Sequence, residues 1–330
     1  MFSLTRLAPG ILLVALIQLL AGWLVGFIPL LDTLTIGVLL GILINNVFQL
    51  PAAVGPGVKF TEKRILQWGI ILLGIELNFA LIWRLGGRII FLIVATVALG
   101  LIAAQLLGRI FKINDKLAVL LGVGSSVCGA SAVAAVEPIV QPEKEDMAMA
   151  IAAISLLGAA GVVLFPFLGR LMNMEQVTYG IWAGVSLQGV AHAVAAAFAY
   201  GEVSGEIGTL VKMGRVVMLA PVAIFLNWRY AGQVAGGPSR KRWLPPEVIG
   251  FVTVGLLATW EILPRIISFG GLAVDLKALS KTFITAAMVA MGLGVNLQRL
   301  GARGLRALVM GATLFAVLAG ASRFLLTFLV

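Results

Sequence analysis

Hydrophobic positions in this chain gather into apolar runs of about 20 residues, separated by short polar or basic connections. About 20 apolar residues cross the hydrocarbon core of a bilayer as a helix, so each run predicts one transmembrane span. We expect an all-α membrane protein whose residues 1–330 form one transmembrane domain, with an extra N-terminal helix at about 8–27. The eleven predicted spans cover residues 8–27, 30–49, 63–83, 88–107, 117–139, 147–169, 176–200, 206–228, 246–263, 280–298 and 305–328.

Two of these runs contain small and polar residues near their middle. The run 117–139 includes the sequence GVGSSVCG at 122–129, and the run 176–200 includes SLQG at 186–189. Glycine costs roughly 1 kcal/mol inside a helix, and an interrupted helix at membrane depth must be buried in protein or line a wet cavity. Two breaks at one depth are typical of inverted-repeat secondary transporters. The alternative is that these small residues only allow close helix packing.

A broken helix exposes an N-terminus that favours anions. Lys212 and Arg215 lie three residues apart on one face of the span 206–228 and would add positive charge, with Arg215 the deeper of the two. Alternatively, Lys212 extends to the outer interface, or either cation pairs with Glu76. The predicted substrate-binding residues are Ser125, Ser126, Cys128, Gly129, Ser131, Ser186, Gln188, Gly189, His192, Lys212 and Arg215.

Coupling to a proton or sodium ion would need a polar group inside a span. Glu76 is the best candidate, supported by Asn78 and Asn296, although an ion pair between Glu76 and Lys212 or Arg215 is an equal alternative. His192 could relay protons because its unperturbed pKa is near neutrality, or it could only be a packing residue.

Two pairs of segments resemble each other within the chain. Residues 73–77 (LGIEL) match 293–297 (LGVNL), and their spans would have opposite orientations, as an inverted repeat requires. Residues 130–135 (ASAVAA) match 191–196 (AHAVAA), but these lie two spans apart and would be parallel. The two pairs are not compatible with one repeat register.

Composition agrees with a membrane protein and limits the chemistry. The chain is 61% hydrophobic and 12% charged, with mean hydropathy +1.08 and net charge +10. Most Lys and Arg residues fall on one side if the N-terminus is cytoplasmic and the C-terminus outside, so the positive charge indicates topology rather than a nucleic-acid partner. One cysteine and one histidine exclude an internal disulfide and argue against a metal site, a cofactor or enzymatic activity.

The chain resembles the bacterial YeiH-type family, which carries a sulfate-exporter label. The resemblance rests on residues 125–140 (SSVCGASAVAAVEPIV), 184–201 (GVSLQGVAHAVAAAFAYG) and 211–221 (VKMGRVVMLAP), with 72–79 (LLGIELNF) in support. It implies a multi-pass inner-membrane protein similar to bile-acid symporters and cation/proton antiporters, which have crossed, broken helices. A homodimer is expected by analogy. Relatives have His-Asp-Thr where this chain has Gln-Gly-Val at 188–190, so proton coupling would rest on His192 or Glu76.

These observations predict a secondary active transporter that exports or exchanges a small anion, such as sulfate or an organosulfonate, by alternating access. An anion channel is the first alternative, but no span shows the ring-forming charges of a filter. A membrane-embedded enzyme is the second, and it would need a catalytic cluster that the sequence lacks.

Overall fold

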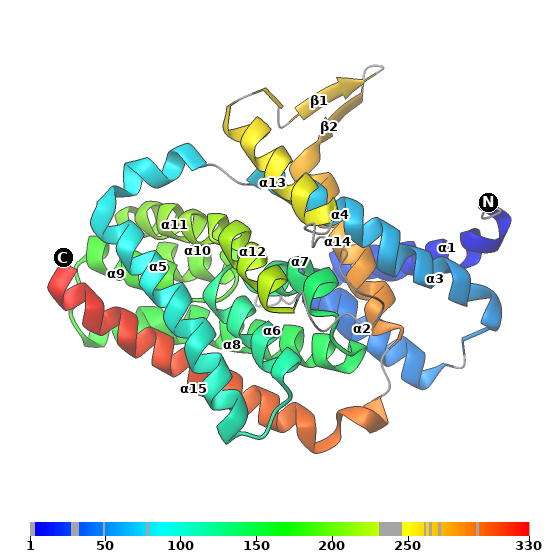
Figure 1. Ribbon diagram of the computed structural model, residues 1–330, viewed down its shortest axis with the longest axis horizontal. Helices are drawn as coiled ribbons and strands as arrows, with labels where there is room; N and C mark the ends of the chain where they lie inside the picture. The colour runs from blue at the N-terminus through cyan, green and yellow to red at the C-terminus, as the bar shows by residue number, and fades with distance from the viewer. Residues whose placement is uncertain are drawn as a thin grey trace.

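The computed structural model describes residues 4–27, 33–48, 50–76, 79–230, 246–260, 262–263, 266–269, 272–294 and 297–329. Helices make up nearly all of this part of the chain, and a small β-hairpin extends from one side (Figure 1). The helices are α1 (Leu4–Leu24), α2 (Thr33–Val47), η1 (Ala52–Val54), α3 (Gly55–Phe60), η2 (Thr61–Ile65), α4 (Leu66–Leu73), η3 (Gly74–Glu76), α5 (Phe79–Ile110), α6 (Asp115–Ser126), α7 (Ala130–Val140), α8 (Lys144–Leu171), α9 (Gln176–Ser186), α10 (Val190–Phe198), α11 (Glu202–Val217), α12 (Leu219–Tyr230), α13 (Pro246–Thr259), α14 (Leu276–Gly292) and α15 (Leu297–Leu329).

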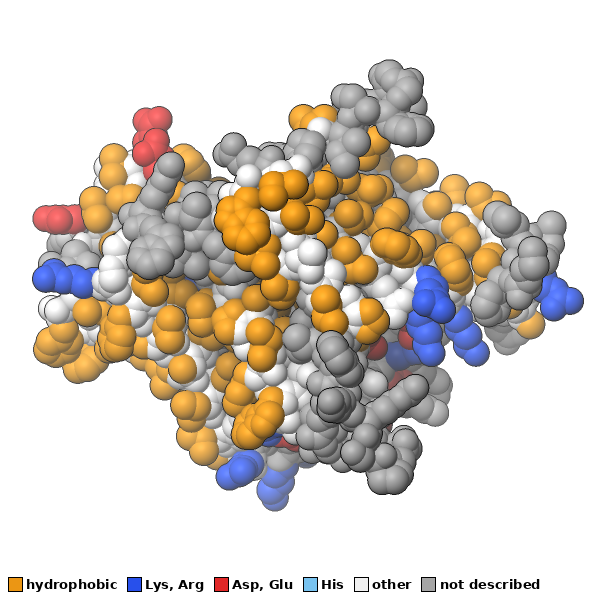
Figure 2. Space-filling model, turned by 45° about the horizontal axis from the view of Figure 1, so that its top comes forward, with side chains coloured by type: hydrophobic (Ala, Val, Ile, Leu, Met, Phe, Trp, Pro, Cys, Tyr) orange, Lys and Arg blue, Asp and Glu red, His pale blue; other side chains and the backbone are white. Residues whose placement is uncertain are grey.

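Five helical segments in the described residues are long and apolar enough to cross a membrane: Arg6–Leu24, Gly86–Ile110, Lys144–Leu171, Glu202–Tyr230 and Arg303–Leu329. They coincide with five predicted spans. Large hydrophobic side chains cover much of the surface in Figure 2, with charged side chains at its edges. Trp228, for example, is 75% exposed, which suits contact with lipid rather than water. The predicted spans 30–49, 63–83, 246–263 and 280–298 stay predictions.

The helices form two groups that lie side by side (Figure 1). Helices α1 to α4 pack with α13 and α14, whereas α5 to α12 pack with α15. Fewer contacts join the groups. Two of these are polar: the buried hydroxyls of Thr35 and Ser155 lie 2.5 Å apart, and Lys144 Nζ lies 2.7 Å from Glu62 Oε2.

Helices α6 and α7 form a helical hairpin, which we call the first hairpin. Asn114 caps α6 by accepting a hydrogen bond from the Leu117 amide at 2.7 Å. The chain reverses after Ser126, and Lys116 Nζ, near the start of α6, donates to the Gln141 carbonyl, just after α7, at 2.7 Å. A straight path through both helices would separate these residues by more than about 30 Å, so α7 must run back beside α6.

Helices α9 and α10 form the second hairpin. Tyr179, early in α9, donates from its hydroxyl to the Ala196 carbonyl, late in α10, at 3.0 Å. A Cβ on Gly201, just after α10, would lie 2.4 Å from Oε1 of Gln176, the first residue of α9. Both ends of this hairpin therefore lie together, at the end of α8 where Arg170 donates to the Ala199 carbonyl at 3.2 Å.

The predictions that 117–139 and 176–200 each cross the membrane are therefore wrong. The breaks are where the sequence placed them, but each chain segment reverses there instead of continuing. The two ends of the first hairpin lie beside the start of α8, and those of the second lie beside its end. Because α8 has 28 residues, these two points are about 40 Å apart. The two hairpins thus enter the molecule from opposite ends.

A second departure is the antiparallel β-hairpin of β1 (Ile266–Phe269) and β2 (Leu272–Asp275), because we expected no strands. It lies between α13 and α14, and Asp275 then caps α14 through the Lys277 amide at 2.8 Å.

Candidate functional site

The tips of the two hairpins meet inside the molecule. We define the tips as residues 127–129 and 187–189. Gly129 has φ +82° and ψ −138°, a conformation that favours glycine, and a Cβ there would lie only 3.0 Å from the Gly189 Cα. Gln188 Nε2 donates to Ser125 Oγ at 3.3 Å across the contact. The contact brings the predicted substrate-binding residues of both breaks together.

Lys212 in α11 is 0% exposed and binds both tips. Its Nζ donates to the carbonyls of Val127 at 2.9 Å, Leu187 at 2.6 Å and Gln188 at 2.5 Å. An ammonium has three N–H donors, so these bonds use all of them. Lys212 therefore does not extend to the outer interface, and in this conformation no N–H is left for a ligand.

Arg215, one turn further along α11, is 1% exposed and also binds both hairpins. Its Nε donates to the Ser126 carbonyl at 2.9 Å and its Nη2 to the Ser125 carbonyl at 2.6 Å. Its Nη1 lies 2.6 Å from the Val185 carbonyl oxygen and 2.8 Å from that of Leu187. The guanidinium thus satisfies the last carbonyls of α6 and α9, which helix ends leave without partners.

The close approach of α11 to α9 makes these bonds reachable. A Cβ on Gly184 would lie 2.8 Å from the Gly208 carbonyl oxygen, so only glycine allows the two backbones to lie this near. On that face of α11, the spacing of three residues places Lys212 and Arg215 toward the same hairpins.

The meeting tips carry net positive charge. Neither Lys212 nor Arg215 forms an ion pair with a carboxylate of the described residues. The C-termini of α6 and α9 contribute roughly half a negative charge each, and the N-termini of α7 and α10 roughly half a positive charge each. With the two cations, the sum is roughly +2. The carboxylate of Glu76, which acts on Cys128 in the first tip, opposes part of this charge, and the balance still favours an anion over a cation.

The other predicted substrate-binding residues lie in or beside the tips. Ser125, Ser126, Cys128 and Ser186 are buried, and Ser131 is partly buried in the first turn of α7. Ser186 and Ser322 of α15 pair through their hydroxyls at 2.7 Å, a partner that the sequence did not reveal.

His192 lies in the first turn of α10, with its ring close to the backbone of Gly158 in α8. A Cβ on Gly158 would come within 2.4 Å of the His192 Nδ1. Proton transfer by His192 stays a prediction.

Of the predicted coupling residues, Glu76 is described, and its carboxylate lies within electrostatic range of Cys128 in the first tip. Glu76 Oε1 lies 3.4 Å from Lys277 Nζ, so the alternative in which Glu76 forms an ion pair with Lys212 or Arg215 is wrong. The sequence carries no signal that pairs Glu76 with Lys277, which lies 201 positions further along the chain. Asn78 and Asn296 lie outside the described residues.

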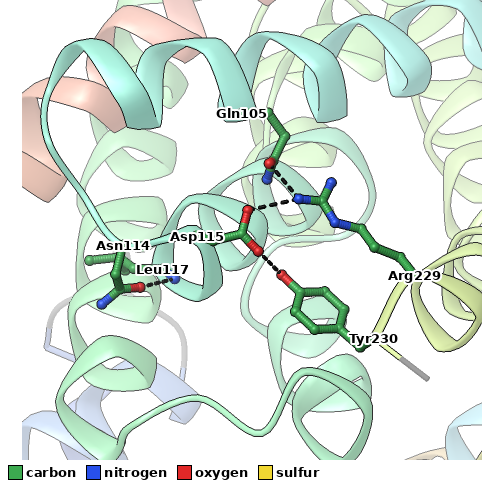
Figure 3. A network of polar contacts seen from close by, with 6 residues as sticks. All are labelled: Gln105, Asn114, Asp115, Leu117, Arg229 and Tyr230. Carbon is green, nitrogen blue, oxygen red and sulfur yellow. Dashed lines mark hydrogen bonds and ion pairs between the residues drawn. The ribbon is translucent and has the colours of Figure 1, made fainter. Parts of the chain in front are cut away.

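A polar network holds the base of the first hairpin (Figure 3). Arg229 at the end of α12 donates to Asp115 Oδ1 and to Gln105 Oε1, both at 2.7 Å, and the Tyr230 hydroxyl donates to Asp115 Oδ2. The sequence signal for this site was the pair Asn114-Asp115 before an apolar run, which predicts a helix start but not its distant partners.

A cavity of about 450 Å³ lies beside this network, where α6, α8 and α15 begin. Asp146 in its wall is 1% exposed, and both of its carboxylate oxygens accept from Asn114 Nδ2, at 3.0 and 2.9 Å. Lys112, Glu143, Arg303 and Arg306 also line it. Three cations against two carboxylates leave this wall positive.

Among the described residues, no group of three or more His, Cys, Asp or Glu side chains could hold a metal ion. The chemistry of the tips is therefore that of amides, hydroxyls, one thiol and two cations.

These features define an all-α membrane protein with two opposed helical hairpins. The chain belongs to the family described as conserved hypothetical protein 698, the YeiH-type family, whose model matches residues 9–311. It is 32% identical over 300 residues to a UPF0324 membrane protein of Corynebacterium glutamicum, covering 90% of this chain and 85% of the relative. It is 33% identical over 294 residues to one of Agrobacterium fabrum, covering 89% and 83%. A third, from Streptococcus agalactiae, is 31% identical over 315 residues, covering 92% of each. The predicted family is confirmed.

Proposed function

We propose that this protein is a secondary active transporter of a small anion, and that the anion binds where the two hairpin tips meet. The observation that carries the proposal is the pair of fully buried cations, Lys212 and Arg215, with no carboxylate partner in the described chain. Buried charges require compensation, and the helix N-termini beside the tips offer amide donors to an anion. Sulfate and organosulfonates are the first candidates.

The cations act on the anion through charge rather than through direct hydrogen bonds. All three N–H groups of Lys212 and most of those of Arg215 go to backbone carbonyls. The ligand contacts themselves would come from the starts of α7 and α10. Ser131 and His192 lie in these first turns and would flank the anion.

We place the protein in the bacterial inner membrane with the N-terminus cytoplasmic and the C-terminus outside. The base of the first hairpin then faces the cytoplasm and that of the second faces outward. Relative to the predicted topology, Lys144 moves to the cytoplasmic side and Arg170 to the outer side, because neither hairpin crosses. The cytoplasmic side therefore gains Lys144 and loses Arg170, and the excess of Lys and Arg on that side is unchanged.

Counterflow tests the proposal. Proteoliposomes preloaded with unlabelled anion should take up labelled anion faster than empty ones, and the rate should saturate. The panel contains sulfate, methanesulfonate, 2-hydroxyethanesulfonate, acetate and glycolate. An Arg215→Gln variant should lose the exchange, whereas Arg109→Gln, at an exposed position at the end of α5, should retain it.

A channel would instead conduct without acceleration by internal anion. Absence of saturable exchange for every anion, with correctly folded protein, would contradict the transporter. Proton or sodium coupling is measured in the same vesicles by imposing either gradient.

A further inference from the structure

Buried polar atoms without a hydrogen-bond partner at the tips include Ser126 Oγ, which lies against the backbone of Gly100 in α5, and Gln188 Oε1 between the two hairpins. The carbonyls at the ends of α6 and α9 are occupied by Lys212 and Arg215. The side-chain Oε1 of Gln188 is fully buried and has no hydrogen-bond partner in the described residues. An unpaired buried acceptor is costly, so native proteins rarely keep one without a ligand or water.

Contacts on its other polar atoms fix the position of Gln188. Its backbone carbonyl accepts from Lys212 Nζ, and its Nε2 donates to Ser125 Oγ. Its backbone lies against the other tip, since a Cβ on Gly129 would be 3.6 Å from the Gln188 carbonyl carbon. Gly129 and Gly189 precede α7 and α10 directly. The free acceptor therefore belongs to a residue held between the two helix N-termini.

We propose that the transported anion carries its own hydrogen-bond donor, an O–H or N–H group, and that Gln188 Oε1 accepts from it. This inference rests on the proposed function and narrows its substrate class to hydroxy- or amino-substituted small oxyanions. The anionic group of the ligand faces the amides of α7 and α10, while its donor pairs with Gln188. Gln188 is thus the residue that determines specificity within the site.

Sulfate makes the consequence clear. Near neutral pH it is fully ionised and has acceptors only, so it would leave Gln188 Oε1 without a partner. A ligand with a hydroxyl beside its anionic group fills both requirements. Sites that hydrogen-bond a substrate group reject analogues that lack it, and we expect at least a tenfold preference.

The test uses two sulfonates of equal charge that differ by one hydroxyl. Calorimetry with the full chain in lipid nanodiscs compares 2-hydroxyethanesulfonate with ethanesulfonate. The wild-type protein should bind the hydroxy ligand at least tenfold more tightly. Gln188→Met, which keeps the side-chain length, should abolish this preference, so that the ratio of the two affinities within the variant falls to about one. Gln67→Met in α4, away from the tips, should keep the preference.

Each outcome decides the matter. Equal wild-type affinities for the two sulfonates would overturn the inference and leave the anion site standing. A preference that survives in Gln188→Met would also overturn it. If neither sulfonate binds, and the same holds for glycolate and acetate, both the anion site and this inference fail. The wild-type comparison decides even if the variant does not fold.

Discussion

Replacement of Gly129 by alanine tests whether the contact between the two tips forms the site. Gly129 has φ +82° and ψ −138°, a region that is essentially restricted to glycine, and holding another residue there costs about 1–3 kcal/mol. The added Cβ would also lie 3.0 Å from Gly189 Cα and 3.3 Å from Gly189 N, tighter than normal packing. Both effects push the tips apart.

If the whole cost falls on the arrangement that binds the anion, affinity should fall about fivefold to 150-fold. Counterflow over a range of substrate concentrations measures this loss, and thermal unfolding in the same lipid measures stability. Gly320→Ala in α15 is the matched control, because a Cβ there meets nothing within 4 Å. Wild-type transport and stability in Gly129→Ala would refute the reasoning that the tips must touch.

Three further predictions follow from specific contacts. Lys212→Met leaves the Val127 and Gln188 carbonyls without their donor, which costs about 1–3 kcal/mol for each. The melting temperature should therefore fall by several degrees, and exchange should be lost. An unchanged melting temperature would contradict this prediction. Asp115→Asn weakens its contact with Arg229, a partly exposed pair worth about 1 kcal/mol or less. Stability should therefore fall slightly, and limited proteolysis should show earlier cleavage by trypsin near Arg229. An unchanged cleavage rate would argue against this anchor. A Thr35→Cys/Ser155→Cys disulfide should stop exchange reversibly, with each single variant unaffected, if the two helix groups move; full transport by the oxidised protein would show that they do not.

The breaks in both hairpins were predictable from composition, but the reversals were not. An apolar run of 23 residues with a central break fits a crossing helix and a hairpin equally well. The deciding contact joins Lys116 to the carbonyl of Gln141, and both residues lie at the ends of the run, where any membrane helix carries polar groups. No periodicity distinguishes these two arrangements.

The reversals resolve an inconsistency in the repeats. The matched segments 130–135 and 191–196 would be parallel if both runs crossed the membrane. In the structure they lie in α7 and α10, the returning helices of hairpins that enter from opposite ends. The two copies therefore run in opposite directions, as an inverted repeat requires.

The sequence also predicted Lys212 and Arg215 as candidate site residues, and the structure shows that the reason was incomplete. A cation inside a predicted span indicates function, and the tendency of helix N-termini to bind anions suggested a direct contact with the ligand. The sequence could not show that backbone carbonyls from two distant hairpins accept the N–H groups of Lys212 and Arg215. Every residue type has a backbone carbonyl, so no residue pattern marks these acceptors.

These bonds constrain how the site could open. Lys212 donates to both tips, and Arg215 binds the last carbonyls of both α6 and α9. If one hairpin moved away alone, several carbonyls would lose their partners inside the membrane, where no water replaces them and each costs several kcal/mol. Moving α5 to α12 with α15 as one body keeps every one of these bonds. It disturbs only the contacts with the other helix group, such as Thr35 with Ser155. Alternating access by relative motion of the two groups is therefore less costly than opening either tip.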